Sequence, residues 1–249
     1  MIKGIEIFKE YFHDYKEQYV LIGGGACDLI FEDIGADFRA TKDLDLVLIV
    51  EALTPEFGKR FWDFIRDGGY KNKVKSDGKP QFYRFDKPQQ ARFPFMIELF
   101  TRVDAVFNYI DHGCIPIHLG EELSSLSAIL MNDDYYRLLL QGKTVVADVV
   151  ILSHIYLIPF KAKAWLDLSQ RRATIGGISE RDIKKHKNDI VRLAAILTGN
   201  ERCELQESIK TDMQQFIAQF EEDPAEPKDL NIPGLSAKDI IEVLHKVYL

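Results

Sequence analysis

Cysteine and histidine are scarce in this sequence and show no metal-binding spacing. The three cysteines, an odd number, lie far apart and form no CxxC pair. Neither a disulfide framework nor a cysteine-rich zinc site is therefore expected. The six histidines include no HExxH pattern, which a zinc-binding helix of that type would show. Any metal ion bound by this chain is expected to have oxygen ligands.

Long apolar segments are also absent. The longest apolar run, residues 149–160, is shorter than the roughly 20 residues that span a bilayer, and Ser153, His154 and Pro159 interrupt it. The N-terminal segment is charged and amphipathic, and it lacks the apolar core of about 7 to 15 residues that marks a secretory signal. We therefore expect no membrane contact and a cytoplasmic location.

The composition otherwise matches that of an ordinary globular protein. Of 249 residues, 46% are hydrophobic and 29% are charged, which excludes disordered and collagen-like classes. The formal net charge of −7 disfavours sequence-independent coating of nucleic acid. Charge is unevenly distributed, because residues 161–192 hold nine Lys or Arg against four acids, whereas residues 201–229 hold nine acids against three bases. Lys184, Lys185 and Lys187 either bind the end of an RNA or form salt bridges to this acidic segment.

The first half of the chain alternates helical and strand patterns. Apolar residues recur at helical spacing between residues 5 and 15, and residues 19–22 form a short apolar strand that runs into three glycines. The patterns also predict strands at 44–50, 81–85 and 93–100, and a helix at 56–66. This order indicates an α/β (α+β) fold, in which a mixed sheet has flanking helices.

Helical patterns dominate after about residue 150. The apolar residues between 183 and 197, and those between 240 and 244, each mark one face of an amphipathic helix. Just before this part, residues 135–140 and 144–146 flank a Gln-Gly turn and are predicted to form a small hairpin. We expect an α/β domain over residues 1–150 and a helical C-terminal domain over residues 151–249.

Two carboxylates begin the strand predicted at 44–50. Asp43 and Asp45 are two residues apart, so a strand sends both side chains to the same face. Beyond them both faces of the strand are apolar, which indicates a covered strand with acids only at its end. Two adjacent carboxylates repel each other and attract a cation, and hard oxygen ligands suit Mg²⁺ carrying a nucleotide phosphate. The alternative is a pair of acids on the wet face of a surface strand.

Two further features point to the same chemistry. Gly23 and Gly24 follow a strand and open a helix, where backbone N–H groups can bind phosphate oxygens; a tight structural turn is the alternative. Glu98 is the single acid in the apolar strand at 93–100, and burying an acid without a partner is costly. If that strand lies beside the Asp43 strand, Glu98 completes a cluster of three carboxylates able to hold two metal ions. On an edge strand it would face water.

In combination these motifs resemble the nucleotidyltransferase superfamily of the polymerase-β type. That family has a hydrophobic-Gly-Gly/Ser turn, an Asp-x-Asp strand and a third acid on a later strand, which correspond here to residues 22–24, residues 43–45 and Glu98. Residues 39–45 (RATKDLD) are similar to the R-x-T-x-D-[IL]-D stretch of the AbiEii-type branch, whose members include toxins of toxin–antitoxin and phage-defence systems.

Two later segments resemble helices that follow the core in the AbiEii-type branch. They are residues 161–166 (KAKAWL) and residues 185–190 (KHKNDI). At the second motif, His186 stands where that branch has an acid. The resemblance thus extends from residue 22 to residue 190 and implies a nucleotidyltransferase-like catalytic core over residues 1–150.

The resemblance implies an enzyme that transfers an NMP group from an NTP to RNA such as tRNA, to protein or to a small molecule. Asp43, Asp45 and Glu98 would be its catalytic acids and would hold two Mg²⁺ ions, or Mn²⁺ in their place. An antitoxin protein would be a partner. Six residues would bind the nucleotide: Gly23, Gly24, Arg39, Lys42, Lys161 and Asp189. The two glycines would cradle phosphate oxygens, and Lys161 would pair with the terminal phosphate.

Two other functions stay open at this point. The first is a catalytically silent module on the same fold, which binds a nucleotide or a partner protein. The second is kinase-like phosphotransfer, because the same carboxylates and metal ions serve both reactions.

Overall fold

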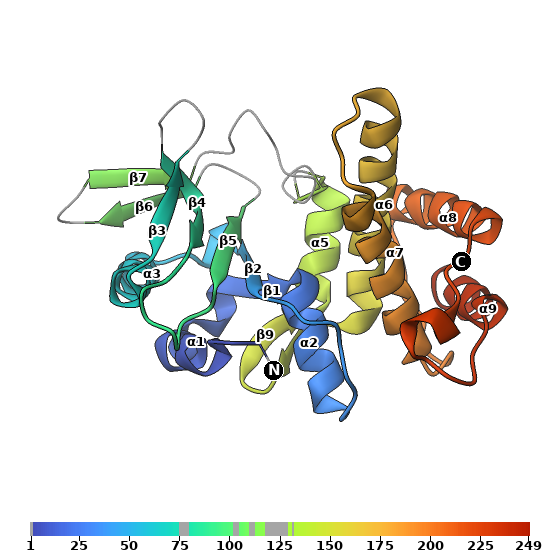
Figure 1. Ribbon diagram of the computed structural model, residues 1–249. Helices are drawn as coiled ribbons and strands as arrows, with labels where there is room; N and C mark the ends of the chain where they lie inside the picture. The colour runs from blue at the N-terminus through green and yellow to red at the C-terminus, as the bar shows by residue number, and fades with distance from the viewer. Residues whose placement is uncertain (1, 75–79, 102–104, 110–112, 118–128, 131) are drawn as a thin grey trace. The chain divides into compact units, whose positions relative to one another are not determined.

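The computed structural model (Figure 1) describes residues 2–74, 80–101, 105–109, 113–117, 129–130 and 132–249, with the backbone alone for 72–74, 80–83, 105–109 and 113–117. Its contacts divide the chain into two compact units. Unit 1 comprises Met1–Leu130 and Lys143–Ser153, and unit 2 comprises Met131–Gly142 and His154–Leu249. Each unit is described by itself below.

Unit 1 is built on a mixed sheet of seven strands in the order β3-β4-β5-β2-β1-β9-β8. Strand β1 pairs antiparallel with β2 and parallel with β9, and β2 pairs parallel with β5. The strands are β1 (Tyr19–Ile22), β2 (Asp43–Leu48), β3 (Lys71–Val74), β4 (Pro80–Asp86), β5 (Met96–Phe100), β8 (Lys143–Val146) and β9 (Val149–Leu152). Strands β6 (Ala105–Tyr109) and β7 (Gly113–Ile117) form a separate antiparallel pair. The predicted mixed α/β sheet with flanking helices is confirmed.

Large aromatic side chains attach two helices of unit 1 to the sheet. Unit 1 contains α1 (Ile5–Phe12), α2 (Gly23–Asp33) and α3 (Pro55–Gly68), and short 3₁₀ turns at His13–Gln18 and Val50–Ala52. The ring centroids of Phe8 of α1 and Tyr19 of β1 are 5.2 Å apart, and those of Phe61 of α3 and Phe85 of β4 are 5.6 Å apart. Full burial of each such side chain stabilises the fold by about 1.5 to 3 kcal/mol, which fixes α1 and α3 against the sheet.

Helix α3 shows why the predicted helix ends where it does. Pro55 stands in its first turn, and the Thr54 hydroxyl oxygen accepts the N–H of Phe57 at 3.3 Å. Gly69 ends the helix with φ 62°, a left-handed conformation suited to glycine. Both end signals lie within two or three residues of the predicted range 56–66, so this helix could be predicted from the local sequence.

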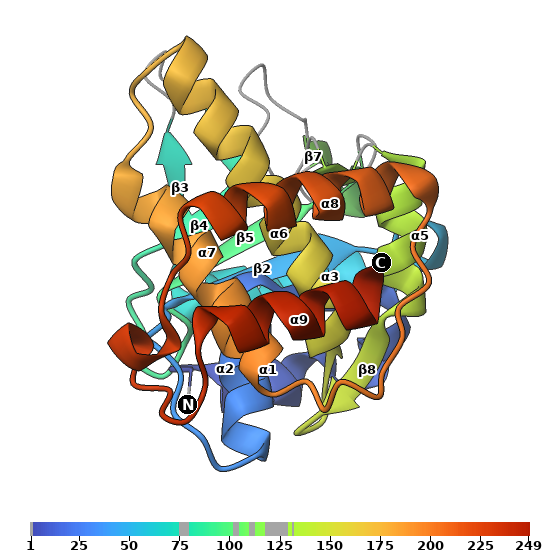
Figure 2. The ribbon, with the colours of Figure 1, turned by 90° about the vertical axis from the view of Figure 1, so that its right-hand side faces the viewer.

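Unit 2 is helical (Figure 2). It contains α5 (Asp133–Gln141), α6 (His154–Thr174), α7 (Glu180–Ala195), α8 (Glu207–Glu222), a 3₁₀ turn at Pro227–Leu230 and α9 (Ala237–Tyr248). Helix α6 packs on α7 and α8, and α9 packs on α7 and α8. The helices predicted near 183–197 and 240–244 are confirmed. Among the described helices, none is both long and apolar enough to cross a membrane.

The hairpin predicted from residues 135–140 and 144–146 is wrong. Residues 135–140 belong to α5, and Asn132 caps this helix with its side-chain oxygen, which accepts the N–H of Asp134 at 2.8 Å. The buried side chains of α5 follow helical rather than strand spacing. The actual hairpin joins β8 to β9 through Ala147 and Asp148, both with positive φ, as in a two-residue turn.

The division into units also differs from a single boundary at residue 150. The first unit closes at Ser153, but the segment Met131–Gly142, which the sequence placed in the first domain, belongs to unit 2. The chain therefore enters unit 2 for α5, returns to unit 1 for β8 and β9, and enters unit 2 again at α6.

Candidate functional site

The candidate site lies at the turn between β1 and α2. Gly23 opens α2 with φ +68°, a left-handed conformation that glycine adopts without strain. A Cβ atom at Gly23 would overlap the carboxylate of Asp45. Glycine is therefore required at this position for two reasons, the backbone conformation and the close approach of the Asp45 side chain.

The first turn of α2 has the properties of an anion-binding end. Its N-cap residue, Ile22, makes no side-chain capping hydrogen bond, and the turn holds no acidic residue. The first N–H groups of a helix lack partners within the helix, and together with the helix dipole they favour negative charge. A phosphate group is a suitable occupant of such a position.

Arg39 and Thr41 lie against the second glycine of the turn. A Cβ atom at Gly24 would be 2.7 Å from the Thr41 hydroxyl oxygen and 3.3 Å from Nη2 of Arg39. The structure therefore brings the predicted residues Gly23, Gly24, Arg39 and Asp45 together in unit 1. Thr41 was not among the predicted site residues, although it stands within the RATKDLD motif.

The carboxylates lie on two neighbouring strands. Asp43 and Asp45 share one face of β2, whose other face is a buried row of leucines. In the parallel pairing of β2 with β5, Asp45 lies directly opposite Glu98, and such opposed residues place their side chains on the same face. Strand β5 lies between β4 and β2. The prediction that the Glu98 strand adjoins the Asp43 strand is confirmed, and the edge-strand alternative is wrong.

The expected metal cluster of three carboxylates is not formed. Within the described part of the chain, no group of three His, Cys, Asp or Glu side chains is placed to hold a metal ion. Instead, Nη2 of Arg84 forms an ion pair with Oε1 of Glu98, and these side chains are 32% and 14% exposed. The expected binding of two metal ions stays a prediction, and Asp43 and Asp45 provide oxygen donors that suit Mg²⁺.

Arg84 is the main residue of the site that the sequence did not reveal. It lies directly opposite Glu98 in the antiparallel pairing of β4 with β5. A strand at 81–85 was predicted, but the local pattern does not say which strand it pairs with or in which register. Only this pairing identifies Arg84 as the partner of Glu98.

Lys42 is engaged with an aromatic side chain. Its ammonium nitrogen lies 5.7 Å from the centroid of the Phe95 ring, within the range of a cation–π interaction. Lys42 directly precedes Asp43 in the chain, and neighbouring residues of an extended segment point to opposite faces. The expected contact between Lys42 and a nucleotide stays a prediction.

Lys161 and Asp189 lie in unit 2 and pair with each other. Nζ of Lys161 on α6 is 2.8 Å from Oδ2 of Asp189 on α7, and the side chains are 6% and 0% exposed. This buried ion pair joins the two helices, and removal of either partner would leave a buried charge. The expected contacts of Lys161 and Asp189 with a nucleotide also stay predictions.

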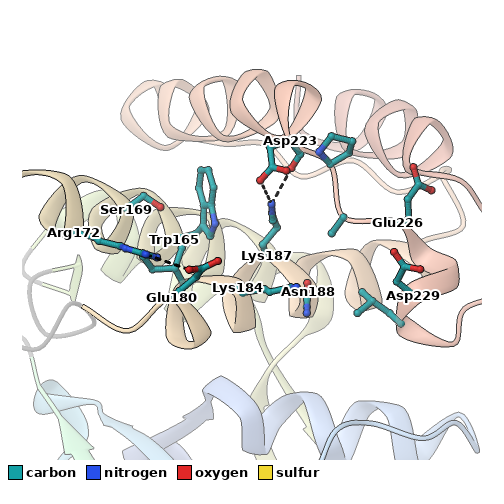
Figure 3. Close-up of a pocket in the computed structure, with 14 residues that line it drawn as sticks. Trp165, Ser169, Arg172, Glu180, Lys184, Lys187, Asn188, Asp223, Glu226 and Asp229 are labelled. Carbon is teal, nitrogen blue, oxygen red and sulfur yellow. Dashed lines mark hydrogen bonds and ion pairs between the residues drawn. The ribbon is translucent and has the colours of Figure 1, made fainter. Parts of the chain in front are cut away.

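Unit 2 contains a pocket of about 630 Å³ between α6, α7 and the segment 223–230 (Figure 3). Two ion pairs link its walls: Arg172 to Glu180 at 3.2 Å, and Lys187 to Asp223 at 2.6 Å. The Lys187 ammonium lowers the pKa of Asp223 below its ordinary value through this hydrogen bond. Of the two alternatives for the lysine cluster, a salt bridge to the acidic segment is therefore observed for Lys187.

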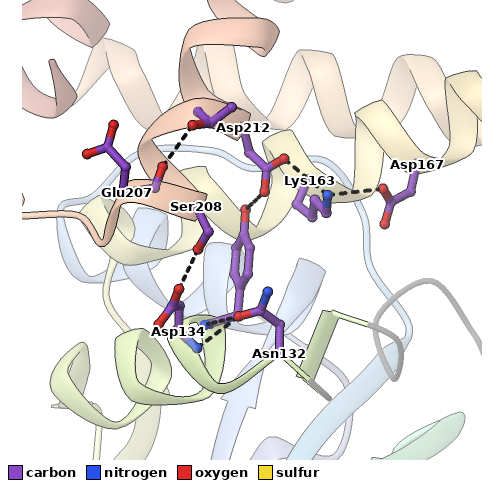
Figure 4. A network of polar contacts seen from close by, with 9 residues as sticks. Asn132, Asp134, Lys163, Asp167, Glu207, Ser208 and Asp212 are labelled. Atoms are coloured by element: carbon purple, nitrogen blue, oxygen red, sulfur yellow. Dashed lines mark hydrogen bonds and ion pairs between the residues drawn. The ribbon is translucent and has the colours of Figure 1, made fainter.

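A second group of titratable side chains in unit 2 forms a polar network that holds helices together (Figure 4). The Tyr135 hydroxyl donates to Oδ2 of Asp212 at 3.0 Å, and Nζ of Lys163 lies 3.1 Å from the other oxygen and 3.5 Å from Asp167. Burial raises the pKa of both Tyr135 and Asp167. The network joins α5 to α6 and α8, which accounts for the place of α5 in unit 2.

Comparison with known proteins gives one structural resemblance. No model of a known protein family matches the chain, and no curated protein matches it. Among solved structures, the chain is similar to the crystal structure of an antigenic nucleotidyltransferase-like protein from Paracoccidioides brasiliensis, at 14% sequence identity and a TM-score of 0.47. The alignment covers 99% of this chain and 95% of that protein. These comparisons assign the chain to no family.

Proposed function

We propose that this protein is a metal-dependent nucleotidyltransferase that moves an NMP group from an NTP to an acceptor. The observation that carries the proposal is the position of the Asp45 carboxylate against Gly23 at the start of α2, with Asp43 on the same face of β2. Anion-binding backbone and cation-binding carboxylates thus adjoin each other, as a metal–triphosphate complex requires.

Different residues of unit 1 would bind the phosphates and the metal ion in this reaction. The N–H groups of Gly23 and Gly24 would donate to phosphate oxygens, and the Arg39 guanidinium beside Gly24 would add a fixed positive charge. Asp43 and Asp45 would hold a Mg²⁺ ion, which supplies positive charge at the triphosphate. In the reaction, an acceptor hydroxyl loses its proton to water and its oxygen bonds to the α-phosphorus, the bond from that phosphorus to the β-bridging oxygen breaks, and pyrophosphate leaves.

Three predicted nucleotide-binding residues carry less weight in this proposal, because each is engaged elsewhere. Lys42 lies over the Phe95 ring, and Lys161 and Asp189 neutralise each other in unit 2. The acceptor, whether tRNA, protein or a small molecule, follows from no residue described above. Membership of the AbiEii-type branch and pairing with an antitoxin rest on the sequence motifs alone and belong to the same proposal.

A second candidate function is a catalytically silent nucleotide-binding module. The observation that favours it is the ion pair between Arg84 and Glu98, because the carboxylate expected to complete a two-metal centre already has a cationic partner. This module would bind the same metal–nucleotide complex and would transfer no group.

Transfer of radiolabel separates these functions. The protein is incubated with Mg²⁺ and α-labelled or γ-labelled NTPs together with total tRNA, bulk protein or small-molecule acceptors. We expect α-label to reach one acceptor class, and Asp45→Asn to abolish the transfer. Transfer of γ-label would instead indicate a kinase-like reaction. Nucleotide binding without transfer of either label would support the silent module.

A further inference from the structure

Arg84 belongs to a row of directly paired residues that crosses the sheet. It lies opposite Glu98 in the pairing of β4 with β5, and Glu98 lies opposite Asp45 in the pairing of β5 with β2. Directly opposed residues place their side chains on one face of a sheet. The Arg84 guanidinium and the two carboxylates therefore share a face, and the Asp45 carboxylate lies against Gly23.

The ion pair between Arg84 and Glu98 is partly removed from water. The Glu98 side chain is 14% exposed and that of Arg84 is 32% exposed, so their attraction is screened less than that of a surface pair. Nε of Arg84 is also buried and has no hydrogen-bond partner in the described part of the chain. A metal ion at Glu98 would have to displace this guanidinium or share the carboxylate with it.

We infer that Arg84 takes the place of a second metal ion, so that the site binds one divalent cation through Asp43 and Asp45. This inference rests on the function proposed above. Glu98 then serves as the anchor that orients the guanidinium rather than as a metal ligand. Arginine suits this role because it stays charged and offers five N–H donors in a planar fork that matches phosphate oxygens. Arg84 thus determines how many divalent cations the site binds.

Counting bound Mn²⁺ tests this inference without an assay of catalysis. The probe is Mn²⁺ titrated into the full-length protein saturated with the α,β-methylene analogue of ATP or of GTP, and bound ions are counted by electron paramagnetic resonance. We expect one Mn²⁺ per chain in the native protein and in Arg84→Lys. We expect two in Arg84→Gln, which frees the Glu98 carboxylate, with a gain of at least tenfold in affinity for the second ion.

Two further variants separate a changed site from a damaged fold. In Arg84→Gln with Glu98→Gln, neither an unpaired charge nor a third carboxylate remains, so one Mn²⁺ is expected again. This double variant and Arg84→Lys carry the test if Arg84→Gln does not fold. Arg66→Gln, which breaks the Arg66–Asp63 ion pair on α3, is the matched control and should leave one ion.

The outcomes distinguish the inference from the proposed function. Two Mn²⁺ per native chain, or one in a folded Arg84→Gln, would overturn the assignment of Arg84 and leave the nucleotide site in place. If Arg84→Gln is unfolded, two ions in Arg84→Lys would overturn it equally. A native protein that binds neither the analogue nor Mn²⁺ would overturn the proposed function, and the assignment of Arg84 with it.

Discussion

At the scale of single residues, Gly23 determines how closely the glycine turn and the Asp45 carboxylate approach each other. Its φ of +68° and the absence of a Cβ atom each meet a separate demand. The same chain contains Gly35, which has φ +70° but no atom within 4 Å of the place a Cβ would take. This pair of glycines separates the cost of backbone strain from the cost of filling the site.

The first prediction concerns alanine at these two glycines. Gly35→Ala is expected to lose about 1 to 2 kcal/mol of stability, the cost of a left-handed conformation for a residue with a Cβ atom. Gly23→Ala is expected to lose more, and to lose at least tenfold in affinity for an NTP, because its methyl group displaces Asp45. Urea unfolding and calorimetry of NTP binding measure both effects. Equal losses in the two variants would contradict the role of Gly23 in the site.

The second prediction concerns pH and His154, the first residue of α6. Burial lowers the pKa of His154 below its ordinary value of 6.5, and Glu201 opposes this shift. The folded chain therefore takes up this proton at a lower pH than the unfolded chain does, and stability falls as pH drops below about 6.5 until the folded pKa is passed.

Unfolding in urea at pH 5, 6, 7 and 8 measures the His154 effect. His154→Gln is expected to flatten the loss of stability below pH 6.5. His13→Gln, which replaces an exposed histidine, controls for the removal of a histidine as such. An unchanged pH dependence in His154→Gln would show that other groups cause the loss.

At the scale of secondary-structure elements, the third prediction concerns the ion pair that joins α6 to α7. Lys161→Met leaves the fully buried Asp189 carboxylate without this partner, and such a loss costs about 3 to 5 kcal/mol. Lys161→Met with Asp189→Leu should recover most of the loss, because no buried charge remains. Urea unfolding of the single and double variants measures this recovery.

An exposed ion pair between the same helices provides the control. Arg172→Gln breaks the pair with Glu180, whose side chains are 45% and 76% exposed, and should cost less than about 1 kcal/mol. A Lys161→Met variant that stays as stable as the native protein and loses NTP affinity would contradict the structural role. It would support the contact of Lys161 with the terminal phosphate.

The sequence predicted the elements whose signals are local. The strand at residues 19–22, the glycine turn and the Asp43–Asp45 strand each follow from spacing within a few residues. The helix at 135–140 was missed because its apolar residues lie close to a Gln-Gly turn that also suits a hairpin. Arg84 was missed because its role depends on the register between β4 and β5, which no local pattern contains.

At the scale of the whole molecule, the chain crosses between its two units three times. The sheet of unit 1 needs β8 and β9, which follow α5, and α5 belongs to unit 2. A cut at the expected boundary near residue 150 would therefore leave α5 attached to the wrong part. This connection could not be predicted, because it depends on which helices bury the apolar face of α5.

The fourth prediction concerns a fragment of residues 1–153. It keeps every strand of the seven-stranded sheet but leaves the buried face of α5 without α6 and α8. We expect it to self-associate and to bind the dye ANS, and we expect both effects to decrease when residues 131–142 are replaced by a Gly-Ser linker of equal length. Light scattering and ANS fluorescence compare the fragments. Equal self-association and equal ANS binding of the two fragments would show that α5 does not need α6 and α8 to cover its apolar face.

The measurement that tests the central claim most directly is Mg²⁺-dependent NTP binding. Calorimetry with each of the four NTPs, with and without Mg²⁺, compares the native protein, Asp45→Asn and Asp33→Asn, which replaces an exposed acid at the end of α2. We predict that at least one NTP binds only with Mg²⁺, that Asp45→Asn weakens binding tenfold or more, and that Asp33→Asn does not. Binding that ignores both Mg²⁺ and Asp45, or no binding of any NTP, would contradict a nucleotide site at Gly23, Asp43 and Asp45.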